Sequence, residues 1–172
     1  MSDAELLARA GAGEASALGV LYDRYAPPLL RFARRLEPHE AEDLLHATFL
    51  RVTQIASRFE SRGPSARAWL FAIMSRVAQE RSRALRRFSR ALSRLSEMPR
   101  HRATYTLETA PDLERAIVRL STAKRTVLLL AEVEGFTCEE IAEMLGVPVG
   151  TVWTRLHHAR KELRAFDRED ES

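Results

Sequence analysis

The C-terminal third of the chain contains two helical patterns joined by a tight turn, and this feature constrains the fold most. Thr137 stands three residues before Glu140 and ahead of an apolar run, which is the spacing of a capping box at a helix start. Gly146 stands where a left-handed residue ends that helix, and Pro148 fits the start of the next one. The second helix has one buried face, at spacings of 4, 3 and 4: Val152, Leu156, Ala159 and Leu163. The pattern predicts a helix-turn-helix.

The opposite side of that second helix carries the candidates for reading DNA. In such motifs the N-terminal exposed side chains contact base edges, and flanking basic residues hold phosphates. We therefore predict a surface made of Gly150, Thr151, Trp153, Thr154, Arg155, His157, His158, Arg160 and Lys161. A hairpin used only for packing or dimerisation is the competing interpretation, and the coincidence of cap, glycine and basic flank disfavours it. The pattern does not predict what Trp153 does.

The rest of the chain also favours helix. Among 172 residues, 45% are hydrophobic, glycine and proline number seven each, and period-two alternation is missing. Periodicity is lost near Met98-Pro99 and resumes after Pro111. We expect an all-α protein of two small helical domains joined by a flexible linker, with boundaries at 1–96, 97–111 and 112–172. No segment has the roughly 18 apolar residues of a membrane span, and the single cysteine, Cys138, suits a reducing cytoplasm.

Three amphipathic segments are expected before the linker. The first spans about residues 18–32, and Pro27-Pro28 should bend or interrupt it. The second starts near His39-Glu40, and its early acids, Glu42 and Asp43, suit either the helix dipole or a basic docking partner. A Gly-Pro loop over 60–65 precedes the third helix, which buries one side and then runs into an arginine-rich stretch.

Charge is distributed unevenly along the chain. The net charge of +3 divides into −3 over residues 1–50, +10 over 51–102 and −4 over 103–172. In the basic part, Arg83, Arg87, Arg90 and Arg94 share a helical face, and arginine without lysine favours phosphate contacts. A merely solvated helix face is the alternative. The polar loop residues beside it, over 60–66, are placed to capture an unpaired base.

Catalytic and metal chemistry have little support. The sequence presents no nucleophile–base pair, and His157, His158 and Cys138 do not form a set of metal ligands. Cys138 is expected to be a half-buried residue at a helix start, with redox sensing as a minor possibility. We expect no enzyme activity, no cofactor and no bound metal.

Taken together, these residues resemble the extracytoplasmic-function sigma factors of bacterial RNA polymerase. The resemblance covers nearly the whole chain. It is carried by Glu134-Gly135-Phe136 through Ala159-Arg160-Lys161, by Ala41-Glu42-Asp43-Leu44 through Phe49, and by Arg67-Ala68-Trp69-Leu70 with the arginine helix. These three pieces resemble, in turn, the part that reads the −35 promoter element, the helix that docks on the β′ clamp, and the part that opens and reads the −10 element.

The resemblance implies partners and site residues. It implies that the chain binds core RNA polymerase at the β′ clamp, binds duplex and single-stranded promoter DNA, and is held inactive by an anti-sigma protein. The polymerase-binding residues would be Glu42, Asp43, His46 and Phe49. The −10 residues would be Arg62, Ser65, Arg76, Glu80, Arg83, Arg86 and Arg87. His46 stands where the family often has Gln, and Arg76 and Glu80 where it often has Asn and Asp.

Two other functions remain open at this point. A stand-alone transcriptional regulator would use the same helix-turn-helix, and it predicts tight promoter binding by the pure protein. An enzyme on a helical scaffold would need a deep polar pocket. The sigma reading predicts weak duplex binding until core polymerase is added.

Overall fold

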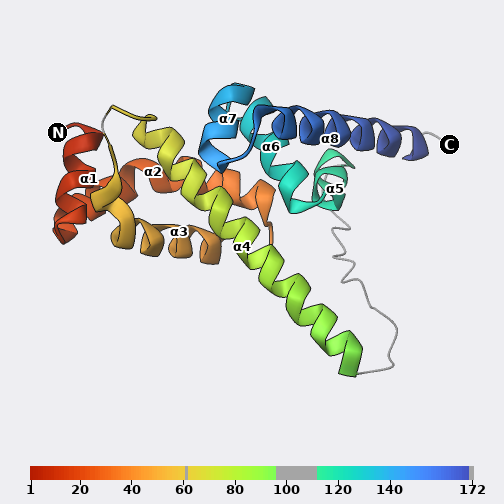
Figure 1. The fold of residues 1–172 in the computed structure, drawn as a ribbon, viewed down its shortest axis with the longest axis horizontal. Coiled ribbons are helices and arrows are strands. Elements are labelled where there is room, and N and C mark those ends of the chain that lie inside the picture. The colour runs from red at the N-terminus through yellow and green to blue at the C-terminus, as the bar shows by residue number, and fades with distance from the viewer. Residues whose placement is uncertain (61, 96–111, 171–172) are drawn as a thin grey trace.

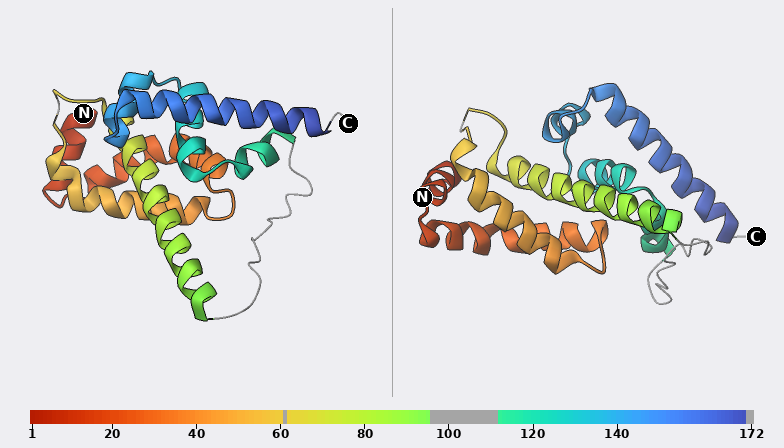
Figure 2. Two further views of the ribbon diagram at one scale, coloured as in Figure 1. Left: turned by 45° about the vertical axis from the view of Figure 1, so that its right-hand side comes forward. Right: turned by 60° about the horizontal axis from the view of Figure 1, so that its bottom comes forward.

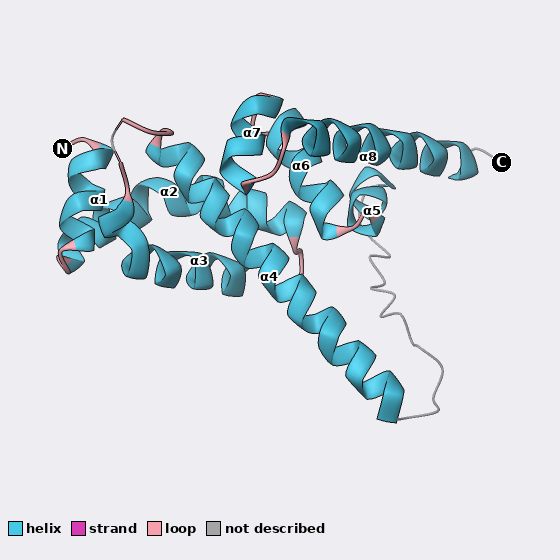
Figure 3. Ribbon diagram, in the orientation of Figure 1, coloured by secondary structure: helices cyan, strands magenta, loops and turns pink. Residues whose placement is uncertain are grey.

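The computed structural model describes residues 1–60, 62–95 and 112–170 (Figure 1). The elements are α1 (Asp3–Gly11), α2 (Ala15–Leu36), α3 (Ala41–Ile55), a 3₁₀ turn η1 (Ala56–Arg58), α4 (Ala66–Leu95), α5 (Asp112–Arg119), α6 (Thr122–Glu132), α7 (Cys138–Leu145) and α8 (Val149–Asp170). None of the described residues forms a strand (Figure 3), so the predicted all-α class is confirmed. The predicted linker, residues 97–111, lies outside the described residues.

Helices α1 to α4 pack around an apolar core. Leu21 and Phe32 of α2, Leu44 of α3 and Phe71 of α4 are fully buried in it. The rings of Phe32 and Phe71 meet edge to face, with centroids 5.2 Å apart, a geometry that aromatic pairs prefer. Burying side chains of this size contributes about 2 kcal/mol each. The 30-residue α4 crosses this core with its first half and projects from the body with its second half (Figure 1).

We expected Pro27-Pro28 to bend or interrupt this segment; helix α2 is continuous, so an interruption is wrong. The two prolines remove the backbone N–H groups that would bond the carbonyls of Asp23 and Arg24 one turn earlier. The buried face runs through this defect, with Leu21 and Tyr25 before it and Leu29 and Phe32 after it. Tertiary packing on both sides therefore outweighs two lost hydrogen bonds.

Helix α1 was not expected from the sequence. Ser2 caps it through a capping box with Glu5, the same motif that starts α7. Tyr25 of α2 donates a hydrogen bond to Asp3, and burial, followed by that bond, raises the pKa of Tyr25 to about 12. A Cβ on Gly11 would lie 2.5 Å from the backbone nitrogen of Ser57, so only glycine permits this approach of α1 to η1.

The C-terminal helices follow the predicted motif closely. The Thr137 hydroxyl accepts a hydrogen bond from the Glu140 backbone N–H, and the Glu140 carboxylate accepts one from that of Thr137, at 3.2 and 2.7 Å. Gly146 ends α7 with a φ of 65°, in the left-handed region. Pro148 directly precedes α8, and its carbonyl accepts a hydrogen bond from Thr151 at 2.9 Å. The capping box and the glycine turn are therefore confirmed.

The two groups of helices share one buried core. Helix α4 contacts α6 and α7, and α2 contacts α5 and α6. The right-hand view of Figure 2 shows α4 between α2 and α3 on one side and the C-terminal helices on the other. Phe136, in the loop before α7, is 8% exposed and lies 5.8 Å from the ring of Phe71. The helix-turn-helix is therefore packed directly on the N-terminal helices.

Candidate nucleic-acid interface

The recognition side of α8 faces solvent. Val152, Leu156 and Ala159 are buried on the inner side, while Trp153 is 56% exposed on the outer one. Four further candidates are exposed beside it: Gly150, Thr154, His157 and His158. The Thr154 hydroxyl donates to the Gly150 carbonyl at 2.8 Å, one helical turn back. The buried stripe thus orients the predicted base-reading side chains outward on one helix face.

The remaining predicted residues of α8, three of which are cations, differ in their surroundings. Thr151 and Arg155 are half-buried, and Lys161 is exposed. The Arg160 guanidinium bonds the Glu132 carboxylate of α6, with one N–O distance of 3.0 Å. Lys161 is therefore available for a phosphate, whereas Arg160 must first give up its bond to α6.

The loop before α4 is built on an aromatic pair. Phe59 and Trp69 meet edge to face with centroids 5.4 Å apart, and both are half-buried against the core. The loop between them presents Arg62 to solvent. Ser65 accepts a hydrogen bond from the backbone N–H of Ala68 at 3.1 Å, which caps the start of α4. Among the described polar residues of the loop, Glu60, Arg62 and Ser65 are exposed.

The predicted −10 residues on α4 fall into two groups. Arg76 donates to the Met144 carbonyl of α7 through Nε and Nη2, at 3.2 and 2.9 Å, and Glu80 pairs with Arg51 of α3 at 3.0 Å. The second group lies on the projecting half of α4 and is exposed: Arg83, Arg86 and Arg87. On the other side of this half, Leu85 and Phe88 are exposed as well.

The exposed side of α3 collects three of the four predicted docking residues. Glu42, Asp43 and His46 are exposed and belong to its first two turns. Phe49 is only 6% exposed, because it lies on the buried face of α3 with its ring 4.8 Å from that of Tyr22. Phe49 therefore does not lie on the exposed docking surface, as was expected, but packs beneath it against α2. Leu50, 63% exposed, is the apolar side chain that α3 presents instead.

Sequence reasoning missed the contacts that join the two groups of helices. Arg67 of α4 pairs with Glu134 at 2.7 Å, and its guanidinium lies over the rings of Phe71 and Phe136, at 4.9 and 4.5 Å from their centroids. Arg125 of α6 is 7% exposed and donates to the carbonyl of Leu36 at the end of α2. No local pattern marks such pairs, because their members lie 67 and 89 positions apart.

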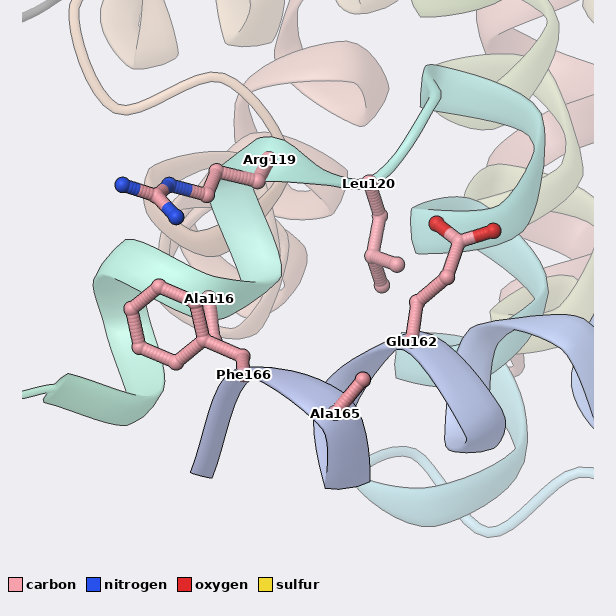
Figure 4. Close-up of a pocket in the computed structure, with 6 residues that line it drawn as sticks. All are labelled: Ala116, Arg119, Leu120, Glu162, Ala165 and Phe166. Carbon is pink, nitrogen blue, oxygen red and sulfur yellow. The ribbon is translucent and has the colours of Figure 1, made fainter. Parts of the chain in front are cut away.

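A pocket between α5 and α8 lies apart from these surfaces (Figure 4). Its lining comprises Ala116, Arg119, Leu120, Glu162, Ala165 and Phe166. The Arg119 guanidinium lies 4.7 Å from the centroid of the Phe166 ring. None of the predicted site residues lines the pocket, so it does not serve the interface described above.

Two features of the described residues bear on other functions. These residues contain no group of three His, Cys, Asp or Glu side chains arranged to hold a metal ion, and Cys138 is half-buried at the start of α7. Within the same residues, no helix combines the length and apolarity needed to cross a membrane.

Two protein-family models match the chain. Residues 21–88 match the family model "Sigma-70 region 2", and residues 111–163 match "Sigma-70, region 4". The ECF RNA polymerase sigma factor SigL of Mycobacterium tuberculosis is 33% identical over 162 residues, covering 90% of this chain and 91% of SigL.

Two solved structures also resemble the chain. CnrH, in complex with the cytosolic domain of CnrY, superposes with a TM-score of 0.68 at 27% identity and covers 99% of both chains. The sigma factor RpoE of Bartonella quintana, in complex with the anti-sigma factor NepR, superposes with a TM-score of 0.66 at 26% identity and covers 87% of this chain and 96% of RpoE. The chain belongs to the extracytoplasmic-function sigma factors, the family that directs RNA polymerase to promoters.

Proposed function

We propose that this sigma factor docks on the β′ clamp of core RNA polymerase through α3 and contacts the promoter at two places. Helix α8 reads the −35 element, and α4 with its preceding loop opens and reads the −10 element. The observation that carries the proposal is the separation of three exposed surfaces on one fold: α3, the projecting half of α4, and the recognition side of α8. The chain binds core polymerase and positions it on the promoter, and we assign the chain no catalytic step. Its place of action is the cytoplasm, where RNA polymerase works.

Run-off transcription is the direct test. Core polymerase with the chain should produce transcripts from a subset of a random promoter pool, and the pure chain should bind the same duplexes weakly. A stand-alone regulator gives the reverse result, with tight duplex binding and no dependence on the chain for initiation. The selected templates would also define both promoter elements.

The docking surface on α3 can be tested separately. Replacing Glu42 and Asp43 by alanine should weaken binding to core polymerase by about tenfold, since an exposed charge that meets a complementary surface contributes on the order of 1 kcal/mol or less. Their exposure in the first turn of α3 supports this role. The measurement is co-elution titration with core polymerase. A matched control replaces Glu139 and Glu143, two exposed acids of α7. Equal binding by both double variants would remove the docking assignment.

In the −10 region, we propose that residues 60–66 hold a flipped base and that Arg83, Arg86 and Arg87 hold phosphates. An unpaired base is recognised by stacking and by hydrogen bonds to its edges, and the polar loop above Phe59 and Trp69 offers the second kind of contact. The exposed arginines provide charge along the path of the strand.

In the −35 region, Thr154 and His158 are proposed to touch base edges. Replacing both by alanine should change the preferred base at one or two positions, with about 1–3 kcal/mol of discrimination lost at each. The measurement is competitive selection of −35 variants by the reconstituted holoenzyme. Lys161→Ala serves as the control, because a phosphate contact lowers binding to all sequences alike. A uniform loss from the Thr154 and His158 variant would identify them as phosphate contacts instead.

An inhibitory protein partner is also proposed. The support is that the two solved relatives were both obtained as complexes, one of them with an anti-sigma factor. A protein that binds this chain in its native cells should suppress the run-off transcript in proportion to its amount. A stoichiometric binder that leaves the transcript unchanged would remove the inhibitory role.

A further inference from the structure

One face of α4 runs the length of the helix and changes its surroundings halfway. At 100° per residue, Ala72, Arg76, Gln79 and Arg83 follow one another on this face at spacings of 4, 3 and 4. Beyond them the same face continues as Arg86, Arg87, Arg90 and Arg94, all exposed. We call this the arginine face. Where α4 crosses the body it contacts α6 and α7 (Figure 2), and Arg76 on this face bonds α7.

The beginning of the arginine face is occupied by the helix-turn-helix. Arg76 bonds the Met144 carbonyl at the C-terminal end of α7 through two nitrogens, at 3.2 and 2.9 Å. Ser82, at the border of the face, accepts a hydrogen bond from the Thr122 hydroxyl of α6 at 3.1 Å. Between them, the Gln79 amide nitrogen is buried and has no hydrogen-bond partner among the described residues.

The chemistry of the Arg76 contact resembles that of a phosphate contact. The last carbonyls of a helix carry partial negative charge, and a guanidinium satisfies them with parallel N–H donors. The cap of α7 uses the carbonyls of Ala142 and Glu143, which leaves the Met144 carbonyl to Arg76. The end of α7 therefore provides Arg76 with an acceptor in the position where a nucleic acid backbone would continue along the arginine face.

A second contact holds α7 in this place. Glu134, just before the motif, pairs with Arg67 at 2.7 Å, and its side chain is only 12% exposed. The neighbouring Phe136 is buried against Phe71, with the Arg67 guanidinium over both rings. None of these four residues belongs to the predicted DNA-binding sets. They hold the helix-turn-helix on α4.

We propose that the end of α7 and the backbone of single-stranded DNA compete for the arginine face of α4, with Arg76 as the residue that both use. In the arrangement seen here, with α7 packed on α4 (the closed chain), Arg76 is exposed but two of its nitrogens are held by the Met144 carbonyl. Release of the Glu134–Phe136 segment frees Arg76 and extends the face by one phosphate contact. The recognition side of α8 stays exposed in the closed chain, so closure restricts α4 and leaves the −35 surface accessible. This inference rests on the proposed role of α4 in holding DNA.

The test uses the full chain and an oligo(dT) strand, which carries no promoter sequence. Glu134→Gln removes the charged part of the anchor and leaves the hydrogen bond from Arg67 to the Glu134 backbone carbonyl, and Glu139→Gln is the control with the same charge change at an exposed site of α7. Glu134→Gln should raise the affinity for oligo(dT) by about fivefold, and the control should not. The salt dependence should steepen by about 0.7 in slope, the value of one added phosphate contact on a single strand. Arg76→Ala in the Glu134→Gln background should abolish both changes.

Opening is measured in parallel by small-angle scattering, with circular dichroism to confirm helix content. The double variant Glu134→Gln with Phe136→Ala gives a stronger release. An opened chain whose oligo(dT) affinity and slope match those of the parent overturns the competition. A double variant that stays closed overturns it too, because the Arg67 contacts then do not hold the closure. Failure of this inference leaves run-off transcription intact, whereas failure of the proposed function removes the transcript for every variant.

Discussion

Replacing Arg125 by methionine is expected to lower the free energy of unfolding by about 3 kcal/mol, because several buried carbonyls lose their donor. The guanidinium donates to the Ile117, Val118 and Leu120 carbonyls at 3.1, 2.6 and 3.0 Å, and also to that of Leu36. Methionine matches much of the volume and supplies no donor. The acceptors are backbone groups at the ends of α2 and α5, so they stay buried after the substitution.

The measurement is urea unfolding followed by circular dichroism. Arg31→Met, at an exposed position of α2, is the matched control and should change stability by less than about 0.5 kcal/mol. If Arg125→Met lowers the free energy of unfolding by less than about 1 kcal/mol, the carbonyls must find other hydrogen-bond donors. Since Arg125 joins α6 to the end of α2, the variant should also loosen the packing between the two groups of helices.

The same substitution should change how stability depends on pH. Burial raises the pKa of the Glu37 carboxyl, and the charge of Arg125 opposes that rise. Because the folded pKa of Glu37 lies above its unfolded value, its contribution is present at low pH and lost as pH rises through the folded pKa. Removing Arg125 raises that pKa further. The loss in free energy of unfolding caused by Arg125→Met should therefore be larger at neutral pH than at acidic pH.

Much of the fold could be predicted from local patterns in the sequence. The capping box at Thr137 and the turn at Gly146 were predicted because each involves backbone groups within a few residues. Helix α1 uses the same kind of box, from Ser2 to Glu5, so its start also has a local signal in the sequence. The interruption expected at Pro27-Pro28 failed for the opposite reason, since core packing along α2 overrides a local defect.

The candidate surfaces were predictable to the extent that helical periodicity determines which side faces solvent. It placed Trp153, Thr154 and His158 outward on α8. It also separates Phe49 from its exposed neighbour Leu50, which points about 100° away on α3, and Phe49 entered the docking set through the family resemblance and not through periodicity. The contacts of Arg67, Arg76 and Arg125 could not be predicted from the sequence, since each depends on how α4 and α6 pack against distant segments. For Arg76, the sequence indicates the chemistry of the side chain but not its present partner.

The second large effect is expected on DNA binding. Replacing Arg83, Arg86 and Arg87 together by alanine should reduce binding of the holoenzyme to a promoter with a single-stranded −10 region on the order of 100-fold at low salt. These residues are exposed on the projecting half of α4, away from the core, so the variant should keep its fold. Its affinity for core polymerase should also be unchanged, because the proposed docking residues lie on α3.

Salt dependence separates a phosphate contact from a general loss of charge. Each phosphate contact on a single strand contributes about 0.7 to the slope of log affinity against log salt, so three lost contacts should lower the slope by about 2. A control with the same charge change replaces Arg31, Arg34 and Arg35, which are exposed on α2. Long-range attraction is screened beyond about 10 Å at 0.1 M salt, so the control should keep nearly the parent slope. If both triple variants lower the slope equally, the arginines of α4 supply only net charge and do not track the DNA strand.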